Sequence, residues 1–252
     1  MLRVTTWTAL IAALVMAAAP ARAIPPLVSG DVPTADEGGF ELFVGYLLGD
    51  SGASQEHELP FWELVYGLTK RQELTIEAPL LLLTGEGQTI LGPGDIVIGT
   101  KYRFIGKPSA DSGASASLEI KLPNADRSRG LGSGATDVDL LTRWGWEIGR
   151  EVVYFNLGRT WVGAPAGEQR RNTWFYAGVW DHPAGPKLRL LLEVYGATSD
   201  DPDGQERLAF TVGLKRKLPG RQQFQLSLGR SLRNRARGGP SWRAYAGWKW
   251  EF

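Results

Sequence analysis

Few residues of this sequence could carry out covalent chemistry. The chain has two histidines, His57 and His182, and no cysteine. Ser51 and Ser54 precede His57 closely, and a serine beside a histidine is the pairing that lipid-modifying hydrolases and acyltransferases use for nucleophilic attack. His182 stands in a predicted turn, and no Gly-x-Ser-x-Gly motif occurs. We therefore predict that the protein is not an enzyme, and we interpret His57 as a solvated loop residue.

Two charged segments could bind ions. Residues 200–204 read Asp-Asp-Pro-Asp-Gly, and carboxylates are calcium ligands, but the remaining spacing of a calcium loop and its distal glutamate are missing. We interpret this segment as a solvated loop, and we predict no metal and no cofactor. Arg233, Arg235 and Arg237 could meet lipopolysaccharide phosphates. An ordinary charged loop explains these arginines equally well.

The overall composition excludes several classes of protein. The 252 residues include 28 Lys and Arg against 27 Asp and Glu, so the formal net charge is +1. No global basic field attracts nucleic acid, and we predict no nucleic-acid partner. The 32 glycines lack a collagen period, and the absence of cysteine excludes a disulfide scaffold.

The first 23 residues have the pattern of a secretory signal peptide. Arg3 provides a positive start, residues 10–19 form an apolar run, and Ala21-Arg22-Ala23 fits the cleavage pattern of small residues. The apolar run is short for a spanning helix, although an N-terminal membrane anchor is the alternative. We predict a signal peptide over residues 1–23 and one exported domain over residues 24–252.

Alternation with a period of two dominates the rest of the chain and predicts β-strands. Phe40, Leu42 and Val44 share one phase, for example, and Leu188, Leu190 and Leu192 share another. The pattern predicts twelve strands, over residues 38–48, 58–69, 72–83, 94–105, 115–123, 135–147, 151–162, 171–181, 186–197, 205–217, 221–231 and 241–252.

The predicted connections alternate between short turns and longer polar loops, which is typical of outer-membrane barrels. Residues 106–114 form one longer connection where that scheme expects a short turn. We predict an all-β fold: a single transmembrane antiparallel up-and-down β-barrel of about 12 strands. A soluble barrel with its apolar face inward has the same periodicity and is the alternative. The strand ends favour the membrane, because tryptophans gather there as they do at membrane interfaces.

The C-terminal strand carries the most specific feature. The chain stops at Phe252, and Trp248 and Trp250 share its phase. This ending is typical of the terminal strand that the barrel assembly machinery reads, so we interpret these three aromatic residues as an assembly signal. We expect this machinery and outer-membrane lipid as partners, in the outer membrane of a Gram-negative envelope.

The charged residues of the strands fall mostly on one phase, which in a membrane barrel lines the lumen. We predict a channel or transporter for passive uptake of small solutes, and the alternatives are a structural or interaction barrel without transport and a lipid-modifying enzyme. The candidate pore-lining residues are Glu41, Glu73, Glu77, Asp95, Lys101, Arg103, Glu119, Lys121, Asp137, Asp139, Arg143, Arg189, Glu193, Arg207, Arg243 and Lys249.

The strand over residues 94–105 allows a specific prediction of facing. A cation on the lipid face near the midplane costs about 2–4 kcal/mol, so Lys101 and Arg103 should point into the lumen. Ile96, Ile98, Tyr102 and Phe104 should then face lipid. We further expect Lys101 and Arg103 to pair with acidic residues of adjacent strands, with Glu77 and Glu119 as the first candidates.

Four stretches of the chain resemble a known family. They are residues 66–74 (Tyr-Gly-Leu-Thr-Lys-Arg-Gln-Glu-Leu), 94–104 (Gly-Asp-Ile-Val-Ile-Gly-Thr-Lys-Tyr-Arg-Phe), 118–123 (Leu-Glu-Ile-Lys-Leu-Pro) and 130–134 (Gly-Leu-Gly-Ser-Gly). In these stretches the sequence resembles the family of outer-membrane transporters named for the phenol meta-degradation pathway. The resemblance implies an outer-membrane barrel and, through the family name, uptake of aromatic compounds. Members commonly have Thr-Gly after the Leu-Pro pair, where this chain has Asn124-Ala125.

Overall fold

The structure is a computed structural model that describes residues 25–233 and 241–252. Nearly all regular structure in these residues is β-strand, apart from one short 3-10 helix, η1 (Arg127–Arg129). The strands are β1 (Phe40–Asp50), β2 (Ser54–Thr69), β3 (Gln72–Glu77), β4 (Leu80–Gly85), β5 (Gln88–Pro93), β6 (Val97–Ile105), β7 (Gly113–Lys121), β8 (Asp137–Ile148), β9 (Glu151–Trp161), β10 (Thr173–Pro183), β11 (Leu188–Ala197), β12 (Arg207–Leu218), β13 (Gln222–Arg233) and β14 (Trp242–Glu251).

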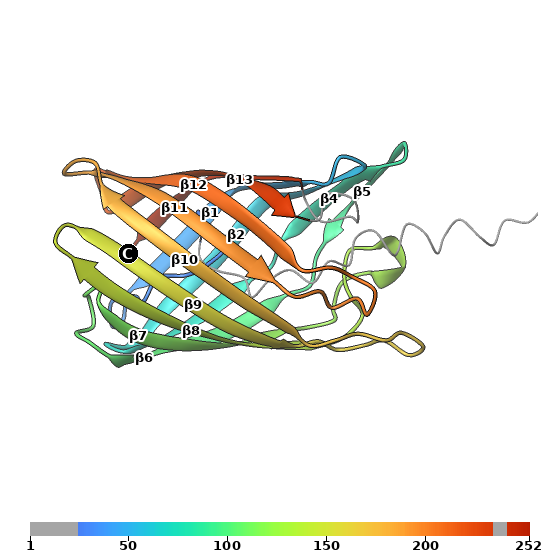
Figure 1. Ribbon diagram of the computed structural model, residues 1–252, viewed down its shortest axis with the longest axis horizontal. Coiled ribbons are helices and arrows are strands. Elements are labelled where there is room, and N and C mark those ends of the chain that lie inside the picture. Colours follow the sequence, from blue (N-terminus) through green and yellow to red (C-terminus); the bar gives the residue numbers. More distant parts are fainter. Residues whose placement is uncertain (1–24, 234–240) are drawn as a thin grey trace, which may run out of the picture.

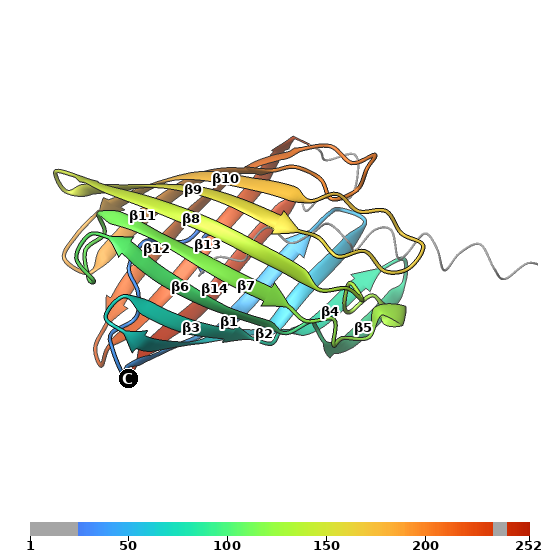
Figure 2. The ribbon, with the colours of Figure 1, turned by 90° about the horizontal axis from the view of Figure 1, so that it is seen from below.

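The strands close into one antiparallel barrel (Figure 1). Sequential neighbours pair from β6 to β14, β3 joins β6 to β2, and β1 pairs with both β2 and β14. Twelve strands of the described chain therefore form the barrel wall, and β4 and β5 extend it at one end, which confirms the predicted fold. Figure 2 shows the tilt of the strands across the barrel. We call the end with the turns at residues 70–71 and 149–150 the turn end, and the opposite end the loop end.

The predicted strand over residues 72–83 is wrong in its second half. The chain leaves the wall after Glu77, and β4 pairs with the first residues of β2 and not with β6. Pro79 lies at the break, and proline has no backbone N–H to donate to a ladder. The predicted loop that follows contains β5, because Glu86 and Gly87 form a two-residue hairpin turn with φ of 48° and 77°.

The predicted facing of the strand over residues 94–105 is confirmed for its central residues. In β6, Lys101 is 2% exposed and Arg103 is 0% exposed, whereas Ile98 is 41% and Tyr102 is 50% exposed. Charged side chains thus lie inside and large apolar ones outside, which is the reverse of a soluble barrel. Phe104 also faces outward, while Ile96 precedes β6 and is half-buried.

The expected pairing with an acidic residue of an adjacent strand is confirmed for Lys101 but not for Arg103, and the partner of Lys101 is Glu73 rather than the first candidates, Glu77 and Glu119. Lys101 pairs with Glu73, 2.9 Å away, because Glu73 lies directly opposite it in the register of β3 and β6. Glu77 and Glu119 lie opposite Val97 and Gly99, farther towards the loop end. Arg103 instead donates to backbone carbonyls of the turn between β6 and β7.

Aromatic side chains at the strand ends point away from the lumen. Trp144, Trp146 and Trp180 lie near the turn end and are 36–50% exposed. Trp174 is the second residue of β10 and Trp242 the first of β14, both at the loop end, and they are 47% and 42% exposed. The two groups have the arrangement of the aromatic belts that flank a bilayer.

Candidate functional site

The candidate site is the inner face of the barrel. Each of the sixteen charged residues that the sequence predicted for the lumen is buried or half-buried. Several of them form ion pairs with inward-facing residues: Glu73 with Lys101 at 2.9 Å, Glu41 with Lys249 at 2.8 Å, Lys121 with Asp137 at 2.5 Å, and Arg189 with Asp181 at 2.6 Å. Their part in solute passage stays a prediction.

Asp95 and Arg143 have different surroundings. Asp95 precedes β6 at the loop end and accepts hydrogen bonds from the backbone N–H groups of Ala125 and Ser133, both at 3.0 Å. It therefore orders the loop between β7 and β8. Arg143 is 2% exposed and donates from Nη1 to Oγ of Ser117, 3.0 Å away.

The lumen contains a stretch of the chain itself, residues 25–35; together with the exposed residues 36–37 that lead to β1, we call residues 25–37 the lumen segment. Its backbone N–H groups donate to wall side chains: Val28 and Ser29 to Glu193 at 2.7–3.1 Å, and Ala35 to Glu73 at 2.6 Å. A buried irregular backbone needs such acceptors, because its N–H groups have no strand partner. Glu193 is 0% exposed, so its carboxylate is committed to this contact.

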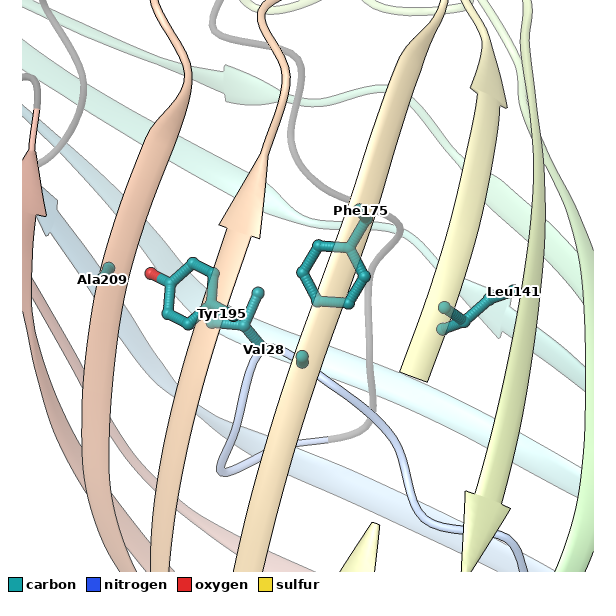
Figure 3. Packing of buried hydrophobic residues seen from close by; sticks show 6 residues of the cluster. Val28, Leu141, Phe175, Tyr195 and Ala209 are labelled. Atoms are coloured by element: carbon teal, nitrogen blue, oxygen red, sulfur yellow. The ribbon is translucent and has the colours of Figure 1, made fainter. Parts of the chain in front are cut away.

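Apolar packing adds to the hold on the lumen segment. Val28 lies in a buried cluster with Leu141, Phe175, Tyr195 and Ala209 from four strands of the wall (Figure 3). A second cluster lies nearer the turn end and contains Leu27 and Val32 of the segment with Val152, Tyr154, Val179 and Leu191. The segment thus replaces water between the wall strands with apolar contacts, which favours its burial.

A charge and a glycine also fit the lumen segment to the wall. Asp31 lies between Lys101 and Lys215, with carboxylate-to-Nζ distances of 3.9 and 3.6 Å. Gly30 donates its N–H to Asn156 at 3.0 Å, and a Cβ added to it would overlap Nε of Arg143. The segment therefore passes very close to the wall at this position.

The long connection between β6 and β7 folds inward at the turn end. Arg103 donates to the carbonyls of Pro108 and Ser112 at 3.2 and 2.8 Å, and the hydroxyl of Tyr154 donates to Asp111 at 2.6 Å. A side chain on Gly145 would overlap the Asp111 carbonyl. This connection and the lumen segment therefore fill the turn end of the barrel together, which explains the one departure from short turns.

A network of charges joins three connections at the loop end. Arg170 pairs with Glu168 and Asp200, both at 2.9 Å, and Glu168 also pairs with Arg127. The hydrogen bond from Arg170 lowers the pKa of Glu168 below its usual value. The interpretation of residues 200–204 as a solvated loop is wrong for Asp200, which is 6% exposed, because Arg170 draws it into this network.

Arg235 and Arg237 lie outside the described residues, as does the predicted signal peptide.

The two histidines lie in strands. His57 belongs to β2 and is half-buried, so its interpretation as a solvated loop residue is wrong: the β1–β2 hairpin extends to Asp50 and Gln55. Its Nδ1 lies 2.6 Å from the hydroxyl of Tyr46, while the hydroxyls of Ser51 and Ser54 contact each other at 2.9 Å.

Sequence reasoning missed several inward residues. Glu63 is 7% exposed and shares an inward phase with Phe61 and Val65, but both phases of this stretch are rich in apolar residues and hid the alternation. Asn156 was missed for the same reason, because β9 is apolar on both phases. The lumen segment itself has no periodicity, so only its buried apolar residues, among them Val28 and Val32, could have indicated it.

The three residues of the predicted assembly signal lie in β14 or directly after it. Trp248 is 42% exposed, Trp250 is half-buried and Phe252 is 66% exposed.

In the described residues, no helix is long and apolar enough to cross a membrane. Those residues also contain no group of three or more side chains arranged to hold a metal ion.

Comparison with solved structures places the fold among outer-membrane barrels. An outer-membrane channel from Pseudomonas putida F1 is 17% identical, with a TM-score of 0.71, and the match covers 90% of this chain and 100% of that one. The KdgM porin, solved with disordered oligogalacturonate, is 9% identical, with a TM-score of 0.56 and coverage of 85% and 99%. The NanC porin is 10% identical, with a TM-score of 0.56 and coverage of 83% and 98%. No curated protein matches the sequence.

Fold and inner face together define the class: a closed antiparallel β-barrel of the outer-membrane type with a charged interior. The sequence profile of the family described as "Putative MetA-pathway of phenol degradation" matches residues 64–242, well over half of the chain. The chain belongs to this family, which confirms the resemblance stated from the sequence.

Proposed function

We propose that the protein is an outer-membrane channel for passive uptake of small solutes, with aromatic compounds as one candidate class. The observation that supports this proposal most directly is that a separate segment of the chain fills the lumen. Wall side chains such as Glu193 and Glu73 hold the lumen segment, and the ladder of the wall closes without it. The segment can therefore move while the barrel stays intact, and its movement opens a path lined with charged residues.

A structural barrel without transport is the second candidate. The filled turn end supports it, because Val32 of the lumen segment and Asp111 of the connection between β6 and β7 both lie against Gly145 of β8 there. A lipid-modifying enzyme is not supported by His57, which contacts the Tyr46 hydroxyl.

Liposome swelling separates the two candidates. The purified protein is reconstituted into liposomes, which are diluted into isotonic sugars, amino acids or aromatic acids. A channel lets the solute in and the liposomes swell at a rate that depends on the solute. Absence of swelling with every solute, together with absence of single-channel conductance, would favour the structural barrel.

A further inference from the structure

Two inward-facing arginines near the loop end differ from the paired cations of the lumen. Arg207 begins β12 and Arg243 is the second residue of β14, and both are half-buried. Within residues 25–233 and 241–252, neither makes a hydrogen bond or an ion pair, whereas Lys101, Lys121 and Lys249 each have a carboxylate within 3 Å. Half-buried charges normally have a partner. Among the described residues, the acidic group that attracts Arg207 is Asp200, and Asp200 is itself paired with Arg170.

The register of the sheet brings the two arginines towards each other. Arg243 lies opposite Gly229 of β13, and Gly229 lies opposite Thr211 of β12. Gly229 has no side chain, so the Arg243 side chain can cross β13 towards β12. Arg207 and Arg243 are close enough to repel each other electrostatically, and both interact with Tyr195. An anion between them would replace this repulsion with attraction.

A hydroxyl group beside the arginines is also unsatisfied. Thr211 lies in the same row as Arg243 on the inward face of β12. Its side chain is 2% exposed, and its hydroxyl has no hydrogen-bond partner in the described part of the chain. Buried hydroxyls without partners are rare, and this one can donate to an anion.

An apolar surface borders the same place. Ala209 lies between Arg207 and Thr211 on the inward face of β12, and Tyr195 of β11 lies directly opposite Ala209. Both belong to the buried cluster that contains Phe175 and is covered by Val28 of the lumen segment (Figure 3). A ligand that extends from the arginines into this cluster would need an apolar body.

We propose that Arg207 and Arg243 form a binding site for a small organic anion with an apolar body, such as an aromatic carboxylate. The guanidinium groups bind the carboxylate, Thr211 donates a hydrogen bond, and the ring meets Tyr195 at the edge of the apolar cluster. The site specifies the substrate class of the proposed channel. Its role in transport, as distinct from binding, rests on that proposed function.

Equilibrium binding tests the site without requiring transport. Benzoate and its neutral analogue benzamide are titrated calorimetrically into the detergent-solubilised full-length protein. We expect benzoate to bind at least about tenfold more tightly than benzamide, because the charge-assisted hydrogen bonds are lost with the neutral ligand. R207Q and R243Q should each weaken benzoate binding about tenfold. R216Q, which changes an exposed arginine of the same strand, should bind as the unchanged protein does.

Each outcome has a separate meaning. Equal binding of benzoate and benzamide, or unchanged binding by the R207Q/R243Q double variant, would overturn the site. Inorganic phosphate that displaces benzoate at equal concentration would overturn the need for an apolar body. Benzoate binding that depends on the arginines, without liposome swelling, would support the site and contradict the channel. Liposome swelling with benzoate at the same rate in the R207Q/R243Q variant would support the channel and contradict a role of the site in transport. Heat-modifiable gel migration confirms that each variant has folded.

Discussion

At the scale of single residues, a buried carboxylate here has a backbone as its partner. Glu193 accepts the N–H groups of Val28 and Ser29, and Glu73 accepts that of Ala35 while it pairs with Lys101. A hydrogen bond to a charged acceptor is worth about 1.5–3 kcal/mol, against about 0.5–1.5 kcal/mol for a neutral one. Charge on these side chains therefore sets how firmly the lumen segment is held.

Replacing Glu193 with glutamine should loosen the lumen segment. The neutral amide accepts the same N–H groups more weakly, by roughly 1 kcal/mol, so the population with a displaced segment should rise about fivefold. Single-channel recordings measure this as more frequent openings. Glu41→Gln is the matched control, because it removes the same charge from a lumenal residue that pairs with Lys249. Equal opening frequencies in the two variants would contradict the role of Glu193.

At the scale of elements, the strands follow from the alternation of residues, and their facing follows from charge. β6 is the clearest case, because two cations on one phase leave a single arrangement that avoids burying charge in lipid. The sequence could not specify the break after Glu77 as readily, since residues 80–83 continue an apolar run beyond Pro79. Whether these residues pair with β6 or with β2 depends on strands that lie elsewhere in the sequence.

Ile98→Arg should impair the stability of the barrel. Ile98 faces outward in β6 and is 41% exposed, so the new cation would point into lipid at a cost of up to about 2–4 kcal/mol, less if it reaches the interface. Urea titration of the protein refolded in bilayers, followed by heat-modifiable migration, should give a lower midpoint. Ile98→Thr keeps the branched side chain without the charge and should behave much more like the unchanged protein. Equal midpoints for both variants would place this side chain away from lipid.

The network of three connections at the loop end should be sensitive to acid. The pKa of Glu168 is lowered from 4.5, mainly by its hydrogen bond with Arg170, so its stabilising effect is complete above pH 4.5. That effect is lost as the pH falls through the lowered pKa. Hydrogen exchange over residues 163–172, corrected for the intrinsic effect of pH, should therefore accelerate below pH 4.5. Glu168→Gln should exchange rapidly at both pH values, and acid acceleration that persists unchanged in this variant would exclude Glu168 as its cause.

At the scale of the whole molecule, the barrel wall could be predicted from the sequence, and the lumen segment inside it could not. The wall was predictable because membrane strands must alternate and the ladder must close. The lumen segment was not, because it has no periodic pattern and its position depends on Glu193, Asn156 and Ser227, which lie far away in the sequence. The inward charges of the candidate site were predictable as a set. The register of the strands was needed to tell which of these charges pair with each other and which hold the lumen segment.

The central claim is that the lumen segment closes a barrel that can otherwise conduct. Deleting residues 25–37 tests it most directly, since β1 begins later, at Phe40, and the closed ladder is retained. The variant is reconstituted in planar bilayers beside the unchanged protein, after heat-modifiable migration has confirmed that both are folded. The account predicts a larger and more persistent single-channel conductance for the deletion variant. Equal conductance of the two folded proteins would contradict it.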